Sequence, residues 1–148
     1  MMRVMVVEDE EMIRKGIVMA VDWAALDCIV VGEAANGEEG LAAAERYSPN
    51  LIITDVRMPR MDGIEMMRRL RERDCTAHFI VLTAYDEFDY ARSALRYGAV
   101  DYLLKPFRDQ DLVAAIARVR EKEGAARPAE DTLLLPKGDK LARLLHIS

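Results

Sequence analysis

Residues 51–70 read LIITDVRMPRMDGIEMMRRL and contain an apolar run, a turn signal and a helical pattern in succession. The run at residues 51–54 is apolar on nearly every position and rich in Ile, which is typical of a parallel strand covered on both faces. The pair Asp62-Gly63 marks a turn. Beyond it, the apolar side chains follow helical spacing at Ile64, Met67 and Leu70. This segment predicts a strand that leads through a polar loop into a helix.

The same alternation recurs on both sides of this segment. Further apolar runs occupy residues 4–7, 29–31, 79–83 and 102–104. Apolar positions with helical spacing lie between and after them: Met12, Ile13, Gly16, Ile17, Ala20 and Val21; Leu41, Ala44 and Tyr47; Phe88, Ala91 and Leu95; Leu112, Ile116 and Val119. Five strands that alternate with five helices require right-handed crossovers. The pattern therefore predicts an α/β fold with a doubly wound, five-stranded parallel sheet.

Composition excludes several classes of protein. The chain has 148 residues, of which 51% are hydrophobic and 32% charged, so it can bury a core. Its net charge of −5 argues against direct nucleic-acid binding, which needs clustered cations. The apolar runs reach about five residues, whereas a membrane span needs roughly 20. Cys28 and Cys75 have neither metal-site nor disulfide-framework spacing, and two free thiols favour a cytoplasmic location.

The alternating pattern ends near Glu123. Residues 124–131 read GAARPAED, which is typical of a linker, and residues 139–148 have the pattern of a short helix capped by Asp139. We therefore expect one domain over residues 1–123 and a linker or tail over residues 124–148.

Polar side chains end four of the five predicted strands. Glu8 and Asp9 follow the first strand, Asp55 the third, and Lys105 the fifth, while Thr83 closes the fourth. In a doubly wound sheet, ligands bind outside the carboxyl ends of the strands. We expect these three carboxylates, one hydroxyl and one ammonium group to meet at one edge of the sheet.

This set of groups suits phosphoryl transfer. Carboxylate oxygens are preferred ligands of Mg²⁺, so Glu8, Asp9 and Asp55 can hold the ion, with the backbone carbonyl of Arg57 as a fourth ligand. Asp55 could then attack phosphorus to form an aspartyl phosphate, assisted by the charge of Lys105 and the hydroxyl of Thr83. Each residue also has a purely structural interpretation. The acids at residues 8–10 could cap the next helix, and the others could be structural or solvated. Their joint placement on strand ends favours the functional interpretation.

The ordered motifs resemble a bacterial response-regulator receiver domain over about residues 3–122. They are Glu8-Asp9, Asp55 within residues 51–63, Thr83-Ala84 and residues 102–107, YLLKPF. The resemblance implies a flavodoxin-like (βα)5 fold with strand order 2-1-3-4-5 and a cis peptide bond between Lys105 and Pro106. It also implies functions for single residues: phosphoacceptor Asp55, Mg²⁺ ligands Glu8 and Asp9, switch pair Thr83 and Tyr102, and phosphoryl contact Lys105. The first acid of the pair is often Asp; here it is Glu8, whose longer side chain could bind the metal directly or through water.

Finer details resemble receivers fused to AraC-type helix-turn-helix domains. They are Trp23, residues 31–37 (VGEAANG) and residues 82–91 (LTAYDEFDYA). This resemblance implies a transcriptional output, but only 25 residues follow Glu123, too few for such a DNA-binding module. We therefore expect a fragment of a longer protein in preference to a stand-alone receiver.

The leading hypothesis is a signalling switch that takes a phosphoryl group from a sensor histidine kinase onto Asp55. Such a protein is no enzyme beyond its own phosphoryl transfer and dephosphorylation. A receiver that acts by protein interaction without phosphorylation is an alternative. A Mg²⁺-dependent phosphatase of the haloacid-dehalogenase type is disfavoured, because Arg57 stands where that family needs a second acid.

A homodimer through the fourth helix, fifth strand and fifth helix is a further expectation. Opposite charges on one patch can pair across a twofold axis. The alternative is an ordinary solvated face, because isolated surface pairs contribute little. The charged residues concerned are Asp86, Glu87, Asp89, Arg92, Arg96, Asp101, Arg108, Asp109, Asp111 and Arg118.

Overall fold

The computed structural model describes residues 1–84, 86 and 88–125, and it divides the chain into two compact units, Met1–Ala117 and Arg118–Ser148. The second unit is described over residues 118–125, which end helix α5. The expected linker beyond residue 125, the short helix at residues 139–148, Glu87 and the side chain of Phe88 lie outside the described residues. The domain boundary at residue 123 stays a prediction.

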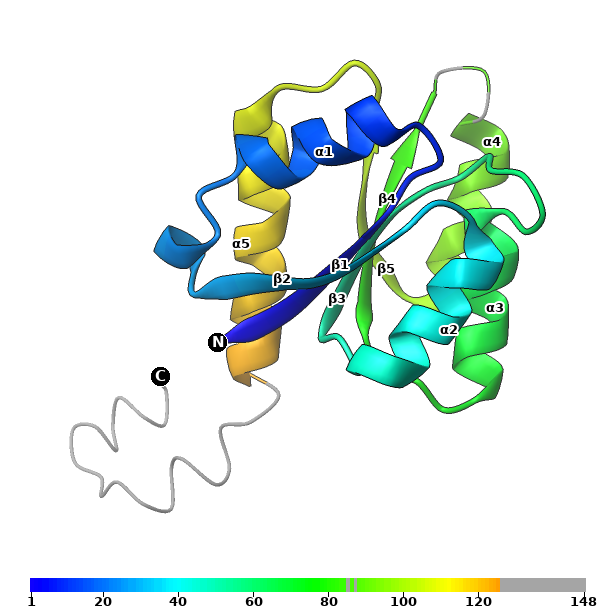
Figure 1. The fold of residues 1–148 in the computed structure, drawn as a ribbon, viewed down its shortest axis with the longest axis horizontal. Helices are drawn as coiled ribbons and strands as arrows, with labels where there is room; N and C mark the ends of the chain where they lie inside the picture. Colours follow the sequence, from blue (N-terminus) through cyan, green and yellow to red (C-terminus); the bar gives the residue numbers. More distant parts are fainter. Residues whose placement is uncertain (85, 87, 126–148) are drawn as a thin grey trace. The chain divides into compact units, whose positions relative to one another are not determined.

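The first unit contains a five-stranded parallel sheet (Figure 1). Its strands are β1 (Met2–Val7), β2 (Cys28–Ala34), β3 (Leu51–Asp55), β4 (His78–Thr83) and β5 (Ala99–Leu104), in the order β2-β1-β3-β4-β5. The predicted strand order is confirmed. Strand β2 continues to Ala34, beyond the predicted run at residues 29–31, and β5 begins at Ala99, before the predicted run at residues 102–104, because partly exposed residues of these edge strands interrupt the apolar runs.

Helices cover both faces of the sheet. Within the first unit, helix α1 (Glu11–Ala20) and the part of α5 (Asp109–Ala125) before residue 118 lie on one face, and α2 (Gly37–Tyr47), α3 (Gly63–Glu72) and α4 (Phe88–Ala91) lie on the other (Figure 1). Two 3₁₀ helices complete the fold, η1 (Ala24–Leu26) and η3 (Arg92–Tyr97). The doubly wound α/β architecture is therefore as predicted.

The three central strands form the core. Every residue of β3 is buried, and alternate residues such as Met5, Ile52 and Phe79 join one apolar cluster with Met66 and Leu70 of α3. The intervening residues are also buried, because both sheet faces are covered. This double coverage explains why the central strands are apolar on consecutive positions.

Three helical stripes differ from expectation, the first of them at Tyr47 of α2, which is 38% exposed. Met12 and Ile13 of α1 are exposed, and within that helix only Ile17 is buried. Leu95 is 56% exposed, because the chain changes from an α-helix to a 3₁₀ helix after Ala91. A 3₁₀ helix has three residues per turn, so the buried partner of Ala91 is Ala94, and Leu95 points about a third of a turn away.

Candidate functional site

The register of the sheet places the predicted site residues at one edge. Val7 of β1 pairs with Thr54 of β3, so Glu8 comes level with Asp55. On the other side of β3, Thr83 of β4 pairs with Leu104 of β5, and Lys105 follows directly. The backbone N–H of Lys105 donates to the carbonyl oxygen of Thr83 at 2.8 Å. The carboxyl ends of four strands thus bring these side chains together.

Three carboxylates form an acidic cluster of Glu8, Asp9 and Asp55. One oxygen of each lies within 4.8 Å of the others. Glu8 is 1% exposed and Asp55 6%, whereas Asp9 is exposed to solvent. Capping of α1 does not explain these acids, because its N-cap residue is Glu10, whose side chain makes no capping hydrogen bond.

Lys105 supplies a positive charge to this cluster. Its Nζ lies 3.2 Å from Oδ1 of Asp55 and 3.4 Å from Oε1 of Glu8. The peptide bond between Lys105 and Pro106 is cis, as the receiver resemblance implied. The ammonium group therefore faces the two buried carboxylates of the acidic cluster.

Burial dominates the titration of Glu8 and Asp55. It raises the pKa of Glu8 to about 7, and the charge of Asp55 adds to the increase. Burial also raises the pKa of Asp55, although Lys105 opposes the change. Burial lowers the pKa of Lys105, but the charges of Asp55 and Glu8 outweigh it, so that pKa is raised. The single ammonium group of Lys105 does not fully offset the negative charge of Glu8 and Asp55. A bound cation would offset more of it.

The donor set fits a magnesium ion. Carboxylate oxygens are hard ligands, and Mg²⁺ usually binds to few protein groups and keeps several waters. A hollow of about 380 Å³ lined by Asp9, Arg57 and Asp62 adjoins the acidic cluster. Arg57 therefore lies beside the site, and its carbonyl as a metal ligand stays a prediction.

Thr83 and Tyr102 are neighbours on one face of the sheet. Tyr102 pairs with Val81, two residues before Thr83, so all three side chains point to the face covered by α2, α3 and α4. Thr83 is buried, and its hydroxyl donates to the carbonyl oxygen of Ala84 at 3.1 Å. Tyr102 is half-buried against the core. The predicted switch residues therefore lie on the same face of the sheet, on neighbouring strands and two register positions apart.

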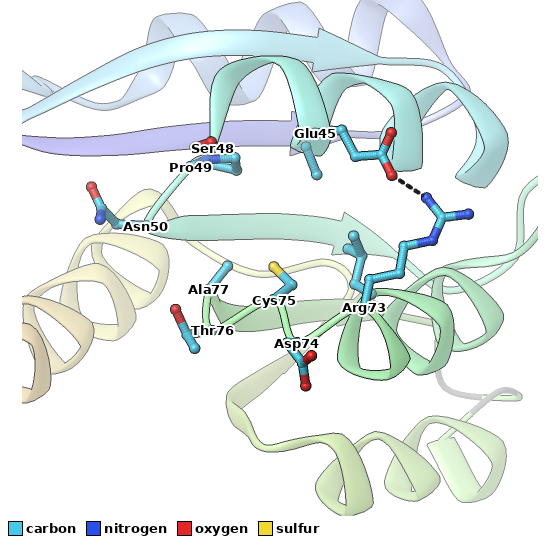
Figure 2. Close-up of a pocket in the computed structure, with 11 residues that line it drawn as sticks. Glu45, Ser48, Pro49, Asn50, Arg73, Asp74, Cys75, Thr76 and Ala77 are labelled. Atoms are coloured by element: carbon cyan, nitrogen blue, oxygen red, sulfur yellow. Dashed lines mark hydrogen bonds and ion pairs between the residues drawn. The ribbon is translucent and has the colours of Figure 1, made fainter.

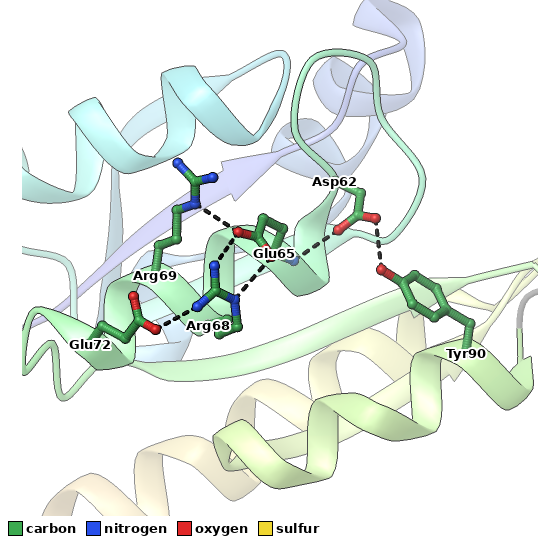
Figure 3. Close-up of polar contacts among 6 residues, drawn as sticks. All are labelled: Asp62, Glu65, Arg68, Arg69, Glu72 and Tyr90. Carbon is green, nitrogen blue, oxygen red and sulfur yellow. Dashed lines mark hydrogen bonds and ion pairs between the residues drawn. The ribbon is translucent and has the colours of Figure 1, made fainter.

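The structure adds two features that sequence reasoning missed. At Gly63, a Cβ would overlap the carbonyl oxygen of Asp55, so only glycine lets α3 begin this close to the site. Asp62 caps α3 by accepting the N–H of Glu65 at 2.8 Å, and it also accepts the hydroxyl of Tyr90 at 2.8 Å (Figure 3). The Asp-Gly pair signals the cap, whereas the sequence holds no signal for the bond to Tyr90.

A second hollow lies away from this chemistry. It has a volume of about 370 Å³ and is lined by the ends of α2 and α3 and by residues 74–77 (Figure 2). Arg73 and Glu45 form an ion pair of 2.5 Å there. Asn50 and Ala77 of its wall precede β3 and β4, so the hollow is at the amino ends of these strands, opposite the acidic cluster.

Comparison with known proteins gives consistent matches. The family model described as the response regulator receiver domain matches residues 4–117. The transcriptional regulatory protein YesN of Bacillus subtilis is 34% identical over 119 residues, which cover 80% of this chain and 32% of that protein. The transcriptional regulatory protein HptR of Staphylococcus aureus is 32% identical, with coverages of 80% and 46%. This chain thus spans less than half the length of these relatives.

Solved structures agree with this match. The receiver domain of AraT, a response regulator from Geobacillus stearothermophilus, has a TM-score of 0.81 and 41% identity, and the match covers 85% of this chain and 98% of that one. A two-component transcriptional regulator AraC from Clostridium phytofermentans has a TM-score of 0.75 and 29% identity, with coverages of 82% and 94%. Among the helices that the structure describes, none is long and apolar enough to cross a membrane.

Proposed function

The chain belongs to the response regulator receiver domain family of two-component systems, and we propose that it is a switch phosphorylated on Asp55 by a sensor histidine kinase. The observation that carries the proposal is the placement of Asp55, which is nearly buried, within 3.2 Å of Lys105 and beside two further carboxylates. The relatives that are transcriptional regulators support transcription as the output of the whole protein.

Asp55 is the nucleophile in this proposal. One carboxylate oxygen attacks phosphorus, the bond from phosphorus to the kinase imidazole breaks, and an aspartyl phosphate forms. Lys105 faces the incoming phosphoryl oxygens and offsets part of their charge. Glu8, Asp9, Asp55 and the carbonyl of Arg57 would hold a Mg²⁺ ion, which when bound neutralises further phosphoryl charge. Attack by water later releases inorganic phosphate and restores the carboxylate.

Thr83 and Tyr102 transmit the effect of Asp55 phosphorylation to the face that carries α4. Phosphorylation replaces the carboxylate charge of Asp55 with a phosphoryl group that carries about −1.5 to −2 charges, and it places strong acceptor oxygens beside Thr83. The Thr83 hydroxyl turns from the carbonyl of Ala84 toward a phosphoryl oxygen, which makes room near α4 for the ring of Tyr102. The result is a population shift between two packings of the face that carries α4.

The partners follow from this function. We place the switch in the cytoplasm, where a kinase would reach it and where its two free thiols would stay reduced. A second copy of the chain could dock on the face formed by α4, β5 and α5. The net charge of −5 favours an output domain outside this chain for contact with nucleic acid.

Phosphorylation with a small-molecule donor tests the proposal. After incubation with acetyl phosphate and Mg²⁺, intact mass spectrometry should find one added phosphoryl group on the parent protein and none on Asp55→Asn. The matched control is Asp74→Asn at the opposite end of the sheet, where a φ of 62° suits asparagine, and it should be labelled like the parent.

Two results would contradict the proposal. An unlabelled parent would favour the alternative in which the receiver acts through protein interaction alone. Equal labelling of Asp55→Asn would place the phosphoacceptor elsewhere in the chain.

A further inference from the structure

Arg14 connects the acidic cluster to a neighbouring strand. It lies in α1, and its side chain is 14% exposed. Nη1 donates to the backbone carbonyl oxygen of Glu8 at 2.7 Å, and Nε donates to Oε1 of Glu33 in β2 at 3.0 Å. One guanidinium group thus joins the chain just after β1 to the strand beside it.

The Glu8 carbonyl controls the geometry of both acids. It belongs to the planar peptide group that joins Glu8 to Asp9, so holding this oxygen also orients the N–H of Asp9. On the other side, the N–H of Glu8 donates to the carbonyl oxygen of Ala34 at 3.0 Å. Arg14 therefore holds the half of the Glu8 backbone that faces Asp9, beyond the last residue of β1.

Glu33 holds the guanidinium group in place. It accepts from Arg14 and, at 3.1 Å, from Lys15. Burial raises the pKa of Glu33, but the hydrogen bonds from Lys15 and Arg14 outweigh it and lower the pKa. Glu33 is thus an ionised anchor, and the rigid fork of arginine donors can reach it and the Glu8 carbonyl together.

We propose that Arg14 is a positioning residue for the metal ligands Glu8 and Asp9, acting through the peptide group between them. Repulsion among three carboxylates favours rotation of the exposed Asp9 away from Glu8 and Asp55. Because Arg14 holds the peptide group between Glu8 and Asp9, these two ligands are already oriented for metal binding before Mg²⁺ binds. This inference rests on the proposed function of the acidic cluster.

Titration of the purified protein with Mg²⁺ alone tests the inference. Arg14→Gln should weaken Mg²⁺ binding about tenfold, the size typical for loss of a group that orients metal ligands. Arg14→Lys should fall between Arg14→Gln and the parent, because an ammonium group lacks the fork that spans both acceptors. The matched control is Lys15→Gln, which removes the neighbouring cation on Glu33 but no contact to Glu8, and it should bind Mg²⁺ like the parent.

Urea unfolding in EDTA separates positioning from a purely structural function. If Arg14→Gln loses stability but, when folded, binds Mg²⁺ as tightly as the parent, the inference is wrong. Should Arg14→Gln not fold, Glu33→Gln removes the anchor alone and should weaken Mg²⁺ binding a few-fold; unchanged binding there also overturns the inference. A parent that binds no Mg²⁺ would instead refute the proposed site itself.

Discussion

The side chain of Glu8 is deeply buried and lies next to other charged groups. Its side chain is 1% exposed, and its carboxylate accepts hydrogen bonds from the N–H of Glu10 at 3.1 Å and from Lys105 at 3.4 Å. These contacts do not offset the desolvation, so its pKa rises to about 7. A buried acid with a raised pKa destabilises the metal-free protein at neutral pH, which is typical of residues kept for function.

The pH dependence of stability follows from this residue. Between the ordinary pKa of 4.5 and about 7, the folded state holds a proton on Glu8 that the unfolded state has lost. The free energy of unfolding must therefore fall as pH rises through this range and level off above it. Asp55, whose pKa is also raised, contributes a slope of the same sign. Glu33 and Glu65 have lowered pKa values and contribute little slope there, because both are ionised folded and unfolded.

Urea unfolding in EDTA measures this slope. We expect the parent to be less stable at about pH 8 than at about pH 5, by on the order of 2 kcal/mol. Glu8→Gln should reduce the difference, and the exposed-site control Glu72→Gln should keep it. Equal stability of the parent at both pH values would show that Glu8 titrates normally.

At the scale of elements, α4 is the shortest of the three helices on the α2–α3–α4 face. It is an α-helix of four residues, followed by six residues of 3₁₀ helix, whose hydrogen-bond geometry is poorer. Tyr90 ties α4 to Asp62 at the start of α3 (Figure 3), and Asp62 lines the hollow beside Asp9 and Arg57. Short elements with few buried contacts open at low free energy. A change at the acidic cluster can therefore shift α4 more readily than its neighbours.

Thr83→Ala tests the path from the site to α4. Amide hydrogen exchange over residues 86–97 should change when the parent binds beryllofluoride and Mg²⁺, a mimic of the phosphorylated state. The variant should still take up a phosphoryl group at Asp55 but show a weaker change in exchange, since it lacks the hydroxyl that moves. The control Thr76→Ala, exposed at the opposite edge, should respond like the parent. If Thr83→Ala responds in full, Thr83 and Tyr102 are not coupled in this protein.

On the scale of the whole molecule, the proposed docking surface for a second copy is the face with α4 and β5, next to the proposed switch residue Tyr102. β5 is an edge strand of half-buried residues. Leu95 is 56% exposed and Leu104 42%, and charges of both signs lie nearby along the chain. Apolar residues with opposite charges around them suit a self-complementary twofold contact. The same residues in a monomer would be an ordinary solvated surface.

Sedimentation velocity distinguishes the two states. We expect beryllofluoride with Mg²⁺ to shift the parent from monomer toward dimer, because the α4 face is the part that the switch rearranges. Leu104→Asp should reduce the shift, whereas Met19→Asp on exposed α1 is the matched control and should keep it. A monomer with and without the mimic at high protein concentration would end the dimer hypothesis for this chain.

Patterns in the amino-acid sequence were sufficient to predict the sheet and most of the candidate site. Hydrophobic periodicity is local information, and it separates doubly covered strands from amphipathic helices. Once the strands are parallel, their carboxyl ends share one edge, so Asp55, Thr83 and Lys105 had to meet there. The location of the site could be predicted from the sequence because it follows from the topology of the sheet.

The contacts made across that edge depend on tertiary packing. Arg14 reaches the Glu8 carbonyl, and Tyr90 reaches Asp62, because of how α1 and α4 are placed on the sheet. The exposure of Leu95 depends on a change of helix type, which apolar spacing does not encode. The raised pKa of Glu8 depends on how completely its neighbours exclude water. Each of these properties arises from the packing of segments distant in sequence, and no local pattern carries that information.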